Sequence, residues 1–551
     1  MRDYRSNKFN TPFRKAMWLN MGYTPEDFKK PKIAIVNSSN NIAICFSHLD
    51  AIAKACAEEI KAAGGMPFEV RTTAPSDFTT VTHDSGYILA SRDLIAYDIE
   101  ASVEGNALDG MICLASCDKT LPGQLIAAAR LNIPTLILTC GYQPCGTYRG
   151  ERFDIDDLFL ANGHFAVGKI TQDELDEMTV AAVKGPGVCQ GIGTANTMHI
   201  TCEALGLTMP GETPVLANSP AMWDSVKRAC TRIVEMVEED MKPREIMTEA
   251  AFANSVKTVL SVSGSTNAIK HLQAAALAAG TDVDIFKMFR EFADDIPLLC
   301  AIRPNGDYSI DDMEAAGGTL AVMKQLSSKL DLDAMTVSGK TLGENLKDAE
   351  VRDDTIIRPL DNAFNYRPAI ILAQGNIAEN FGVIKLRVDD SFKPSKFTGP
   401  AKVFANREIA IAALREGRVQ KGDVLVLQGI GITGSPGQGM VSGLFFALDG
   451  LGLSRDVAVV TDGHASGLCN MCLGVIDVTP EAAAGGNIGL VRDGDIITID
   501  AMNRNLFLDV SDEELAERRK TAPDFKQDPG EGWLRVFQER ARPINEGALL
   551  R

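Results

Sequence analysis

Three cysteines lie far apart along the chain, each in a segment whose neighbouring residues are typical of a ligand-binding loop. Cys45 follows a run of serines and asparagines, Cys117 opens the sequence Cys117-Asp118-Lys119, and Cys189 lies in a glycine-rich segment. Such wide spacing argues against one local zinc knuckle, but it is compatible with three loops that meet around an iron-sulfur cluster. The carboxylate of Asp118 beside Cys117 also indicates a site for a hard cation, which prefers oxygen ligands.

The other cysteines of the 12 in the chain have a simpler interpretation. In a reducing compartment most free cysteines are buried apolar residues, and we expect this of Cys56, Cys113, Cys140, Cys202, Cys230 and Cys300. Cys469 and Cys472 have the spacing of a redox or zinc pair. Because no second pair accompanies them, a structural role is favoured.

Short apolar runs alternate with helical patterns through the first third of the chain. Strands are expected over residues 32–36, 66–72, 110–114 and 135–139, and helices over residues 48–63, 87–103 and 122–131. This alternation predicts βαβ units and a mostly parallel, doubly wound sheet. Ligands of such sheets collect beyond the carboxyl ends of the strands. Cys45 and Cys117 both follow a predicted strand, so we expect them at one edge of the sheet.

The later part of the chain has a different pattern. Helices over residues 197–205, 221–241 and 266–279 occupy the middle, and short β runs separated by glycine begin at about residue 360. Among them, residues 489–500 are expected to form a hairpin whose turn is Arg492 to Asp495. The sequence therefore predicts a second, β-rich domain with a polar tail after about residue 510.

Composition limits the functional classes. The 551 residues have a net charge of −18, which argues against a nucleic-acid partner because phosphate contacts need clustered basic residues. The polar N-terminus has no apolar signal-peptide core, and no apolar run is long enough to cross a bilayer. We therefore expect a cytoplasmic protein without a membrane partner.

Six motifs, in order along the chain, are similar to those of one enzyme family, the dihydroxy-acid and sugar-acid dehydratases, which includes 6-phosphogluconate dehydratase. They are Cys117-Asp-Lys-Thr-Leu-Pro-Gly123, Gly187-Val-Cys-Gln-Gly-Ile-Gly-Thr-Ala-Asn-Thr-Met198, Gly339-Lys-Thr-Leu-Gly-Glu-Asn345, Gly375-Asn-Ile-Ala378 with Val383-Ile-Lys385, Thr461-Asp-Gly-His-Ala-Ser-Gly467, and Pro480-Glu-Ala-Ala-Ala-Gly-Gly486. Together they span most of the chain, so the resemblance is far more specific than any single motif.

This resemblance implies an N-terminal α/β domain, taken as residues 1–355, and a C-terminal β-barrel-like domain, taken as residues 356–551, in a homodimer or homotetramer. It implies a 2Fe-2S cluster bound by Cys45, Cys117 and Cys189.

The resemblance also implies Mg²⁺ near Asp118 and Lys119. The lysine is carboxylated in some family members, and this pair could instead be a plain ion pair. The upstream metal ligand is either Asp77 or Asp84, and Ser466 matches the family's proposed base, although serines after glycine turns often cap helices.

The chemistry fits these residue types. Removing water from a 2,3-dihydroxy acid takes a weakly acidic proton from C2 while hydroxide leaves C3, so two developing charges need stabilising. A cluster with three protein thiolates keeps one iron position open for the hydroxyl, and Mg²⁺ stabilises the enolate oxygens. A serine is a poor base unless a nearby cation lowers its pKa, and Mg²⁺ would supply that cation to Ser466. The expected product is a 2-oxo-3-deoxy acid.

Several departures from the family pattern lie on the substrate and metal side. The segment Ser435-Pro-Gly-Gln-Gly-Met440 lacks the glutamate that usually reaches the metal, so Gln438 or water takes its place. His464 stands where arginine is common, and it and His48 are candidates for substrate binding or for hydrogen-bonded core positions. These departures favour a sugar acid or a related hydroxy acid as substrate. The alternatives are a branched-chain dihydroxy acid or a non-catalytic iron-sulfur sensor.

A weaker pattern indicates a different class. Gly429, Gly431 and Gly434 follow a predicted strand and imitate a dinucleotide-binding fingerprint. Proline and further glycines interrupt the expected helix start, and the next acidic strand end falls late, so a nicotinamide enzyme is disfavoured.

Overall fold

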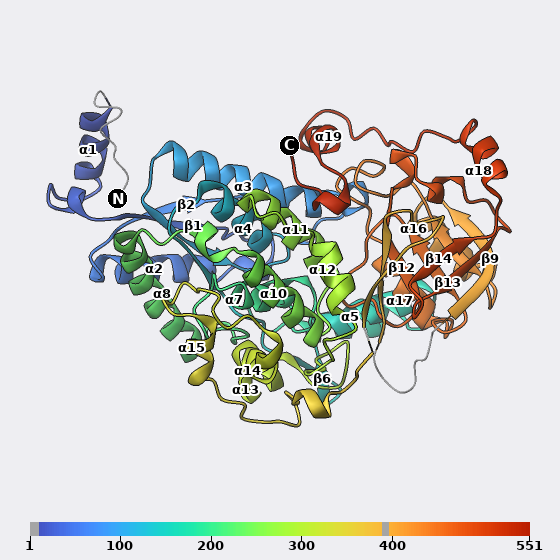
Figure 1. The fold of residues 1–551 in the computed structure, drawn as a ribbon, viewed down its shortest axis with the longest axis horizontal. Coiled ribbons are helices and arrows are strands. Elements are labelled where there is room, and N and C mark those ends of the chain that lie inside the picture. Colours follow the sequence, from blue (N-terminus) through green and yellow to red (C-terminus); the bar gives the residue numbers. More distant parts are fainter. Residues whose placement is uncertain (1–9, 368, 388–395) are drawn as a thin grey trace.

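The protein was analysed as a computed structural model, which describes residues 10–367, 369–387 and 396–551. A four-stranded sheet and an eight-stranded sheet form the centres of two parts of the molecule, which lie at the left and right of Figure 1. No helix in these ranges is long and apolar enough to traverse a bilayer.

The first sheet is entirely parallel, with strand order β2-β1-β3-β4. Its strands and connecting helices are β1 (Lys32–Asn37), α2 (Leu49–Ala62), β2 (Met66–Arg71), α3 (Tyr87–Gly105), β3 (Gly110–Ala115), α4 (Thr120–Leu131) and β4 (Thr135–Thr139). The chain leaves β1 towards one edge of the sheet and returns to β3 on the other side of β1. Since parallel crossovers are right-handed, α2 lies on one face and α3 and α4 on the other. The predicted doubly wound sheet agrees with this topology.

Helices cover this sheet and extend towards the second part of the molecule. They are α5 (Ile155–Ala166), α6 (Gln172–Ala182), α7 (Thr194–Ala204), α8 (Pro220–Glu239), α9 (Pro243–Ile246), α10 (Glu249–Ser261), α11 (Asn267–Ala279), α12 (Ile285–Phe292), α13 (Ile310–Ala316), α14 (Gly318–Gln325) and α15 (Leu342–Lys347), with α1 (Thr11–Asn20) at the start of the chain and the small hairpin β5 (Gly146–Tyr148) and β6 (Glu151–Phe153). Local signals set their ends. The Ser219 side chain accepts a bond from Met222 N at the start of α8, and Gly280 adopts a left-handed conformation after α11.

The second sheet is a nearly closed barrel with strand order β14-β13-β9-β10-β11-β12-β8-β7. Its elements are β7 (Ile370–Ala373), β8 (Phe381–Lys385), β9 (Lys396–Phe404), α16 (Arg407–Arg415), β10 (Val424–Leu427), α17 (Ser442–Gly450), β11 (Ala458–Thr461), β12 (Gly474–Thr479), β13 (Ile496–Asp500) and β14 (Asn505–Leu508). A bridge between Gln374 and Asn505 brings the two edge strands together. The β-barrel-like domain expected from the resemblance is consistent with this sheet.

The predicted hairpin around Arg492 to Asp495 is wrong. Residues Asn487–Leu490 form a 3₁₀ turn, and only β13 is a strand; it forms its hairpin with β14 instead. Ile488 and Leu490 look like strand residues in the sequence because they are apolar, but they are buried in the barrel core without pairing in a sheet.

The two parts share one hydrophobic core that draws residues from both. Helix α5 packs against α17, and the end of the chain folds back onto α3 and α11 through α19 (Trp533–Arg540) and a 3₁₀ turn at Ile544–Glu546, after α18 (Asp512–Arg519). Buried Arg92 donates hydrogen bonds to the carbonyls of Gly547 and Ala548, both at 2.8 Å. The barrel is therefore held against the first sheet, so that loops from both parts can form one site.

Candidate active site

The three motif cysteines reach one cavity from three different elements. Cys45 lies in the 3₁₀ turn Ile44–Phe46 after β1, Cys117 follows β3, and Cys189 lies in the loop before α7. β1 and β3 are neighbours whose crossovers run in opposite directions, and ligands of open α/β sheets bind at such switch points. All three cysteines line this cavity, together with Asp77, Asp118 and Ser466.

Two of the sulfurs are linked by a buried serine. Ser76 Oγ lies 3.9 Å from Cys45 Sγ and 3.7 Å from Cys117 Sγ, and the Cys117 thiol donates to Asp77 Oδ1 at 3.5 Å. Contact with the Cys45 thiol raises the pKa of Cys117, and burial and Asp77 raise it further. Burial and then Asp156 likewise raise the pKa of Cys189. Without a metal Cys117 and Cys189 are therefore neutral thiols, and binding a thiophilic metal must displace their protons.

These residues fit an iron-sulfur cluster better than a single ion. All 12 cysteines are free, and three of them face one buried space. Across the described ranges, no three His, Cys, Asp or Glu side chains are grouped tightly enough to chelate one metal ion. A cluster is larger than an ion and needs sulfurs that surround a wider space, which this cavity provides.

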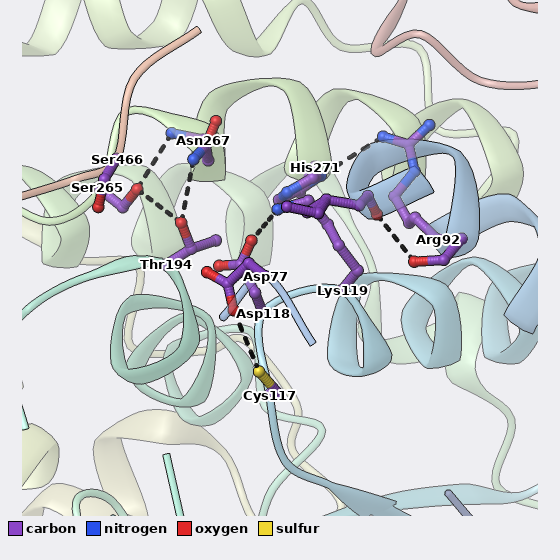
Figure 2. A network of polar contacts seen from close by, with 12 residues as sticks. Asp77, Arg92, Cys117, Asp118, Lys119, Thr194, Ser265, Asn267, His271 and Ser466 are labelled. Atoms are coloured by element: carbon purple, nitrogen blue, oxygen red, sulfur yellow. Dashed lines mark hydrogen bonds and ion pairs between the residues drawn. The ribbon is translucent and has the colours of Figure 1, made fainter. Parts of the chain in front are cut away.

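Two carboxylates that could bind a cation, those of Asp77 and Asp118, lie beside Cys117, and Lys119 lies next to them in Figure 2. Burial and the neighbouring Asp118 raise the pKa of Asp77 to about 6, although Lys119 acts in the opposite direction. Asp118 forms an ion pair with Lys119. Two neighbouring carboxylates, one buried and one half-buried, are a suitable set for a hard cation. Of the two upstream candidates, Asp77 faces this group; the Asp84 side chain lies outside the described part of the structure.

Ser466 enters the cavity from the barrel. It follows β11, its backbone N–H donates to Ser442 Oγ at 2.8 Å, and its Oγ accepts from Leu468 N at 3.3 Å in a local turn. The buried Lys385 side chain donates to the carbonyl of the next residue, Gly467, at 2.7 Å, and burial lowers the pKa of Lys385 to about 7. A hydroxyl held in this way is oriented towards the cavity side of the loop.

Two of the three predicted substrate residues, His48 and Gln438, are engaged elsewhere. The His48 ring bonds to the carbonyl of Cys140 at 2.7 Å, as a core histidine would. Both ends of the Gln438 amide are engaged: Oε1 accepts from Lys270 Nζ at 2.9 Å, and Nε2 donates to Asp477 at 2.6 Å. Neither side chain lines the cavity with the cysteines. His464 is buried close to Lys119, and neither of its ring nitrogens has a hydrogen-bond partner.

Sequence reasoning missed Asn267, which lines the cavity at the start of α11. Its side chain donates to Thr194 Oγ1 at 3.0 Å, and Thr194 also contacts Ser265 Oγ at 3.0 Å, on the Ser466 side of the site in Figure 2. The sequence did contain a signal for this residue. The polar run Ser263-Gly-Ser-Thr-Asn267 directly precedes an alanine-rich helix, and the N-terminal ends of helices commonly face ligands.

In the dinucleotide-like glycine segment, backbone N–H groups already donate hydrogen bonds to side chains of the protein itself. Asp462 accepts from the N–H groups of Gly429 and Ile430, both at 3.0 Å, and Glu481 accepts from Thr433 N at 3.0 Å. These are the donors that a pyrophosphate would need. The glycines therefore allow two buried carboxylates of the protein itself to approach the loop, which disfavours the nicotinamide interpretation.

Removal and restoration of a divalent cation should test the oxygen ligands. A chelator is expected to reduce turnover and Mg²⁺ to restore it, and Asp77→Asn should raise the Mg²⁺ concentration needed for half-maximal turnover by about 10-fold or more, because it removes one charged ligand. Exposed Asp173 on α6 supplies the matched control, Asp173→Asn. A Mg²⁺ titration in which both variants match the parent protein would exclude Asp77 as a ligand.

Comparison with known proteins gives a consistent result over the whole chain. Residues 30–345 match the family model described as dihydroxy-acid/6-phosphogluconate dehydratase N-terminal, and residues 355–548 match its C-terminal counterpart. Proteins named dihydroxy-acid dehydratase from Caldicellulosiruptor saccharolyticus and Caldicellulosiruptor bescii are each 39% identical, over 98% and 99% of this chain and 97% and 100% of their own lengths. The protein of that name from Acetivibrio thermocellus is 37% identical over 97% of both chains.

Proposed function

Because this chain belongs to the dihydroxy-acid/6-phosphogluconate dehydratase family, we propose that it removes water from a 2,3-dihydroxy acid that carries a short alkyl group. The resemblance inferred from the motifs is confirmed, and the chain is a hydro-lyase. The identity of the acid is the proposed part, together with the 2Fe-2S form of the cluster and the assignment of individual residues.

The cavity wall is the observation that supports an alkyl-substituted acid. Beside its polar residues, the cavity is lined by the apolar side chains of Phe78, Phe159, Val188, Met440 and Leu468. An alkyl group beyond C3 is favoured by such a wall, whereas the extra hydroxyls of a sugar acid would lose hydrogen bonds with water there. The earlier preference for a sugar acid is not confirmed, and the names of the relatives favour the branched-chain alternative.

The residues fit the cofactors of such a reaction. In the proposed arrangement Cys45, Cys117 and Cys189 would hold a 2Fe-2S cluster, and Asp77 and Asp118 would hold Mg²⁺, with Lys119 a further ligand only in a carboxylated form. Bound there, the two groups supply Lewis acidity to the C3 hydroxyl and to the oxygens of the forming enolate.

The protein's own part is to place and move protons. Ser466 Oγ, in its alkoxide form, takes the C2 proton while hydroxide leaves C3, and return of that proton to the hydroxide releases water and restores the alkoxide. The enol that remains tautomerises to the 2-oxo acid. The apolar wall holds the alkyl group and excludes bulk water, which strengthens the electrostatic interactions inside the cavity. The Lys385 bond to Gly467 keeps the serine loop in place.

A substrate panel tests this function. Protein purified without oxygen should form a 2-oxo acid from 2,3-dihydroxyisovalerate with a kcat/KM at least about 100-fold above that for an aldonate, because each buried hydroxyl left unpaired costs about 1–3 kcal/mol. Product is measured by reaction with a carbonyl reagent. A preference for the aldonate would overturn the assignment, and a coloured protein without activity on any acid would support the sensor alternative.

We also propose that the chain forms a homodimer or homotetramer. Helix α1 exposes Phe13 and Met17, and Met21 directly after it is also exposed, on the outside of the molecule, where Figure 1 shows the helix projecting beyond α3 and β2. Exposed apolar side chains of this kind are typical of association surfaces.

A further inference from the structure

Two buried histidines, His271 and His464, lie near Lys119. His271 is on helix α11 of the first part, and His464 is in the loop after β11 of the barrel. His464 is 2% exposed and His271 is fully buried. Neither nitrogen of His464 has a hydrogen-bond partner, and Nε2 of His271 also lacks one. Native proteins rarely leave buried polar atoms unpaired, so each such atom indicates a missing partner.

The charges around these imidazoles favour an anion as that partner. Burial lowers the pKa of His464 well below its ordinary value, and the nearby ammonium groups of Lys270 and Lys119 lower it further. His271 lies in the same positive surroundings, close to Lys119 in Figure 2, and its other ring nitrogen is 3.4 Å from Arg92. Lys270 and Lys119 are paired with Asp477 and Asp118, but it is their ammonium groups that act on His464, so a carboxylate, which can accept the N–H of a neutral imidazole, is favoured there.

Main-chain bonds place His464 directly beside the cavity. Its N–H donates to the carbonyl of Gly439 at 3.0 Å, and its carbonyl accepts from Val441 N at 2.9 Å. Met440, between these two partners, lines the cavity, and so does Ser466, two residues after His464. The carboxylate of the substrate is bonded directly to C2. When the C2 proton lies at Ser466, the carboxylate is therefore within reach of His464, which is two residues before the serine in the same loop.

A buried ion pair holds this part of the barrel against α11. Lys270 Nζ lies 3.1 and 3.2 Å from the two oxygens of Asp477 and 2.9 Å from Gln438 Oε1. Gln438 directly precedes Gly439, so Lys270 anchors the segment that pairs with His464. The ion pair thus fixes the segment to which the His464 backbone is bonded.

We propose that His464 binds the carboxylate of the substrate through an imidazole N–H, with the ammonium group of Lys270 behind it. This inference rests on the proposed function, since it assigns the acid group of the proposed substrate. It makes His464 a binding residue and Lys270 a positioning residue that acts through Gln438 and Asp477.

Binding of a product analogue tests His464 without depending on turnover. The probes are a short branched 2-oxo acid and its uncharged carboxamide, and calorimetry measures their dissociation constants on the cluster-containing protein. In the parent protein the acid should bind at least about 10-fold more tightly than the amide, since hydrogen bonds to charged groups contribute more than neutral ones. His464→Phe should weaken the acid about 10-fold or more and leave the amide unchanged. His464→Gln, which keeps a donor, should recover part of the difference.

The controls separate this inference from the fold and from the proposed function. His164→Gln alters a half-buried histidine that bonds to Asp449 at 2.9 Å, outside the site, and should leave both dissociation constants unchanged. An unchanged visible spectrum shows that the variants retain the cluster and its surroundings. Equal losses for acid and amide, or no loss for the acid, would overturn the inference and leave a structural or water-binding role for His464. If the His464-dependent preference is seen in a protein that dehydrates no dihydroxy acid, the proposed function fails and the anion site remains.

A second pair of variants tests Lys270. Lys270→Met should lower kcat about 10-fold or more, because it releases Gln438 and the loop beside Ser466. If the lysine only neutralises Asp477, the double variant Lys270→Met with Asp477→Leu should restore kcat to the parent value. A double variant that remains slow supports the positioning role, and full recovery excludes it.

Discussion

Replacing Cys117 by serine is expected to abolish the visible absorbance of the protein and to lower turnover by about three orders of magnitude or more. Cys117 follows β3 at the centre of the site, with Ser76 between it and Cys45 and with Asp77 at 3.5 Å. A serine hydroxyl is a harder and much less acidic ligand than a thiol, so the cluster would lose one of its three anchors. Absorbance and turnover are measured on protein purified without oxygen.

The control for this variant is Cys145→Ser. Cys145 is only partly buried and does not line the cavity, so the substitution should leave both colour and activity intact. Full turnover in the Cys117→Ser protein would exclude a mechanism that depends on the cluster. Loss of colour in both variants would instead indicate that serine at either position destabilises the fold.

Replacing Ser466 by alanine should separate chemistry from cofactor binding. The variant is expected to keep the cluster spectrum, because the serine is not a sulfur ligand, and to lose about three orders of magnitude in kcat, because the proposed proton acceptor is gone. The fold should tolerate the change: the backbone bond from Ser466 N to Ser442 remains, and only the turn bond to Leu468 N is lost, at a cost of about 1 kcal/mol.

Ser454→Ala provides the comparison for this loss. Ser454 lies outside the cavity and bonds weakly to Asp449 at 3.4 Å. Both proteins are assayed for kcat, KM and visible absorbance. If the Ser466→Ala protein turns over at the rate of the Ser454→Ala protein, the serine is not the base, and another group near the Mg²⁺ ligands must take the C2 proton.

The N-terminal sheet was predictable because its strands are short and mostly apolar, and β1, β3 and β4 are buried on both faces. Residues 135–139 were expected as a strand and form β4 with the same bounds, and the helix expected from residue 87 begins there. Local pattern decides the structure of such segments.

The barrel was less predictable because pairing across the sheet decides its strands. β9 carries a glycine and a proline within Lys396–Phe404, a composition that disfavours a strand, yet it pairs with both β10 and β13. The expected β run before Arg492 is instead a buried turn. These outcomes depend on tertiary contacts that a single segment does not encode.

The residues of the site were likewise predictable only where a local motif identified them. Motifs identified the cysteines, Asp118 and Ser466, and the structure brings these residues to one cavity with Asp77. Lys270 gave no such signal, because a lysine on a helix is normally exposed. Its partner Asp477 lies 207 residues further along the chain, so only the folded protein reveals the pair.

The central claim is that Cys45, Cys117 and Cys189 together hold one iron-sulfur cluster at the switch point of the parallel sheet. The most direct measurement is the iron and acid-labile sulfide content of protein purified without oxygen, compared with a variant in which all three cysteines are serine. We predict about two irons and two sulfides per chain in the parent and essentially none in the variant. Equal iron and sulfide in the two proteins, or dehydratase activity in parent protein free of iron, would contradict the account.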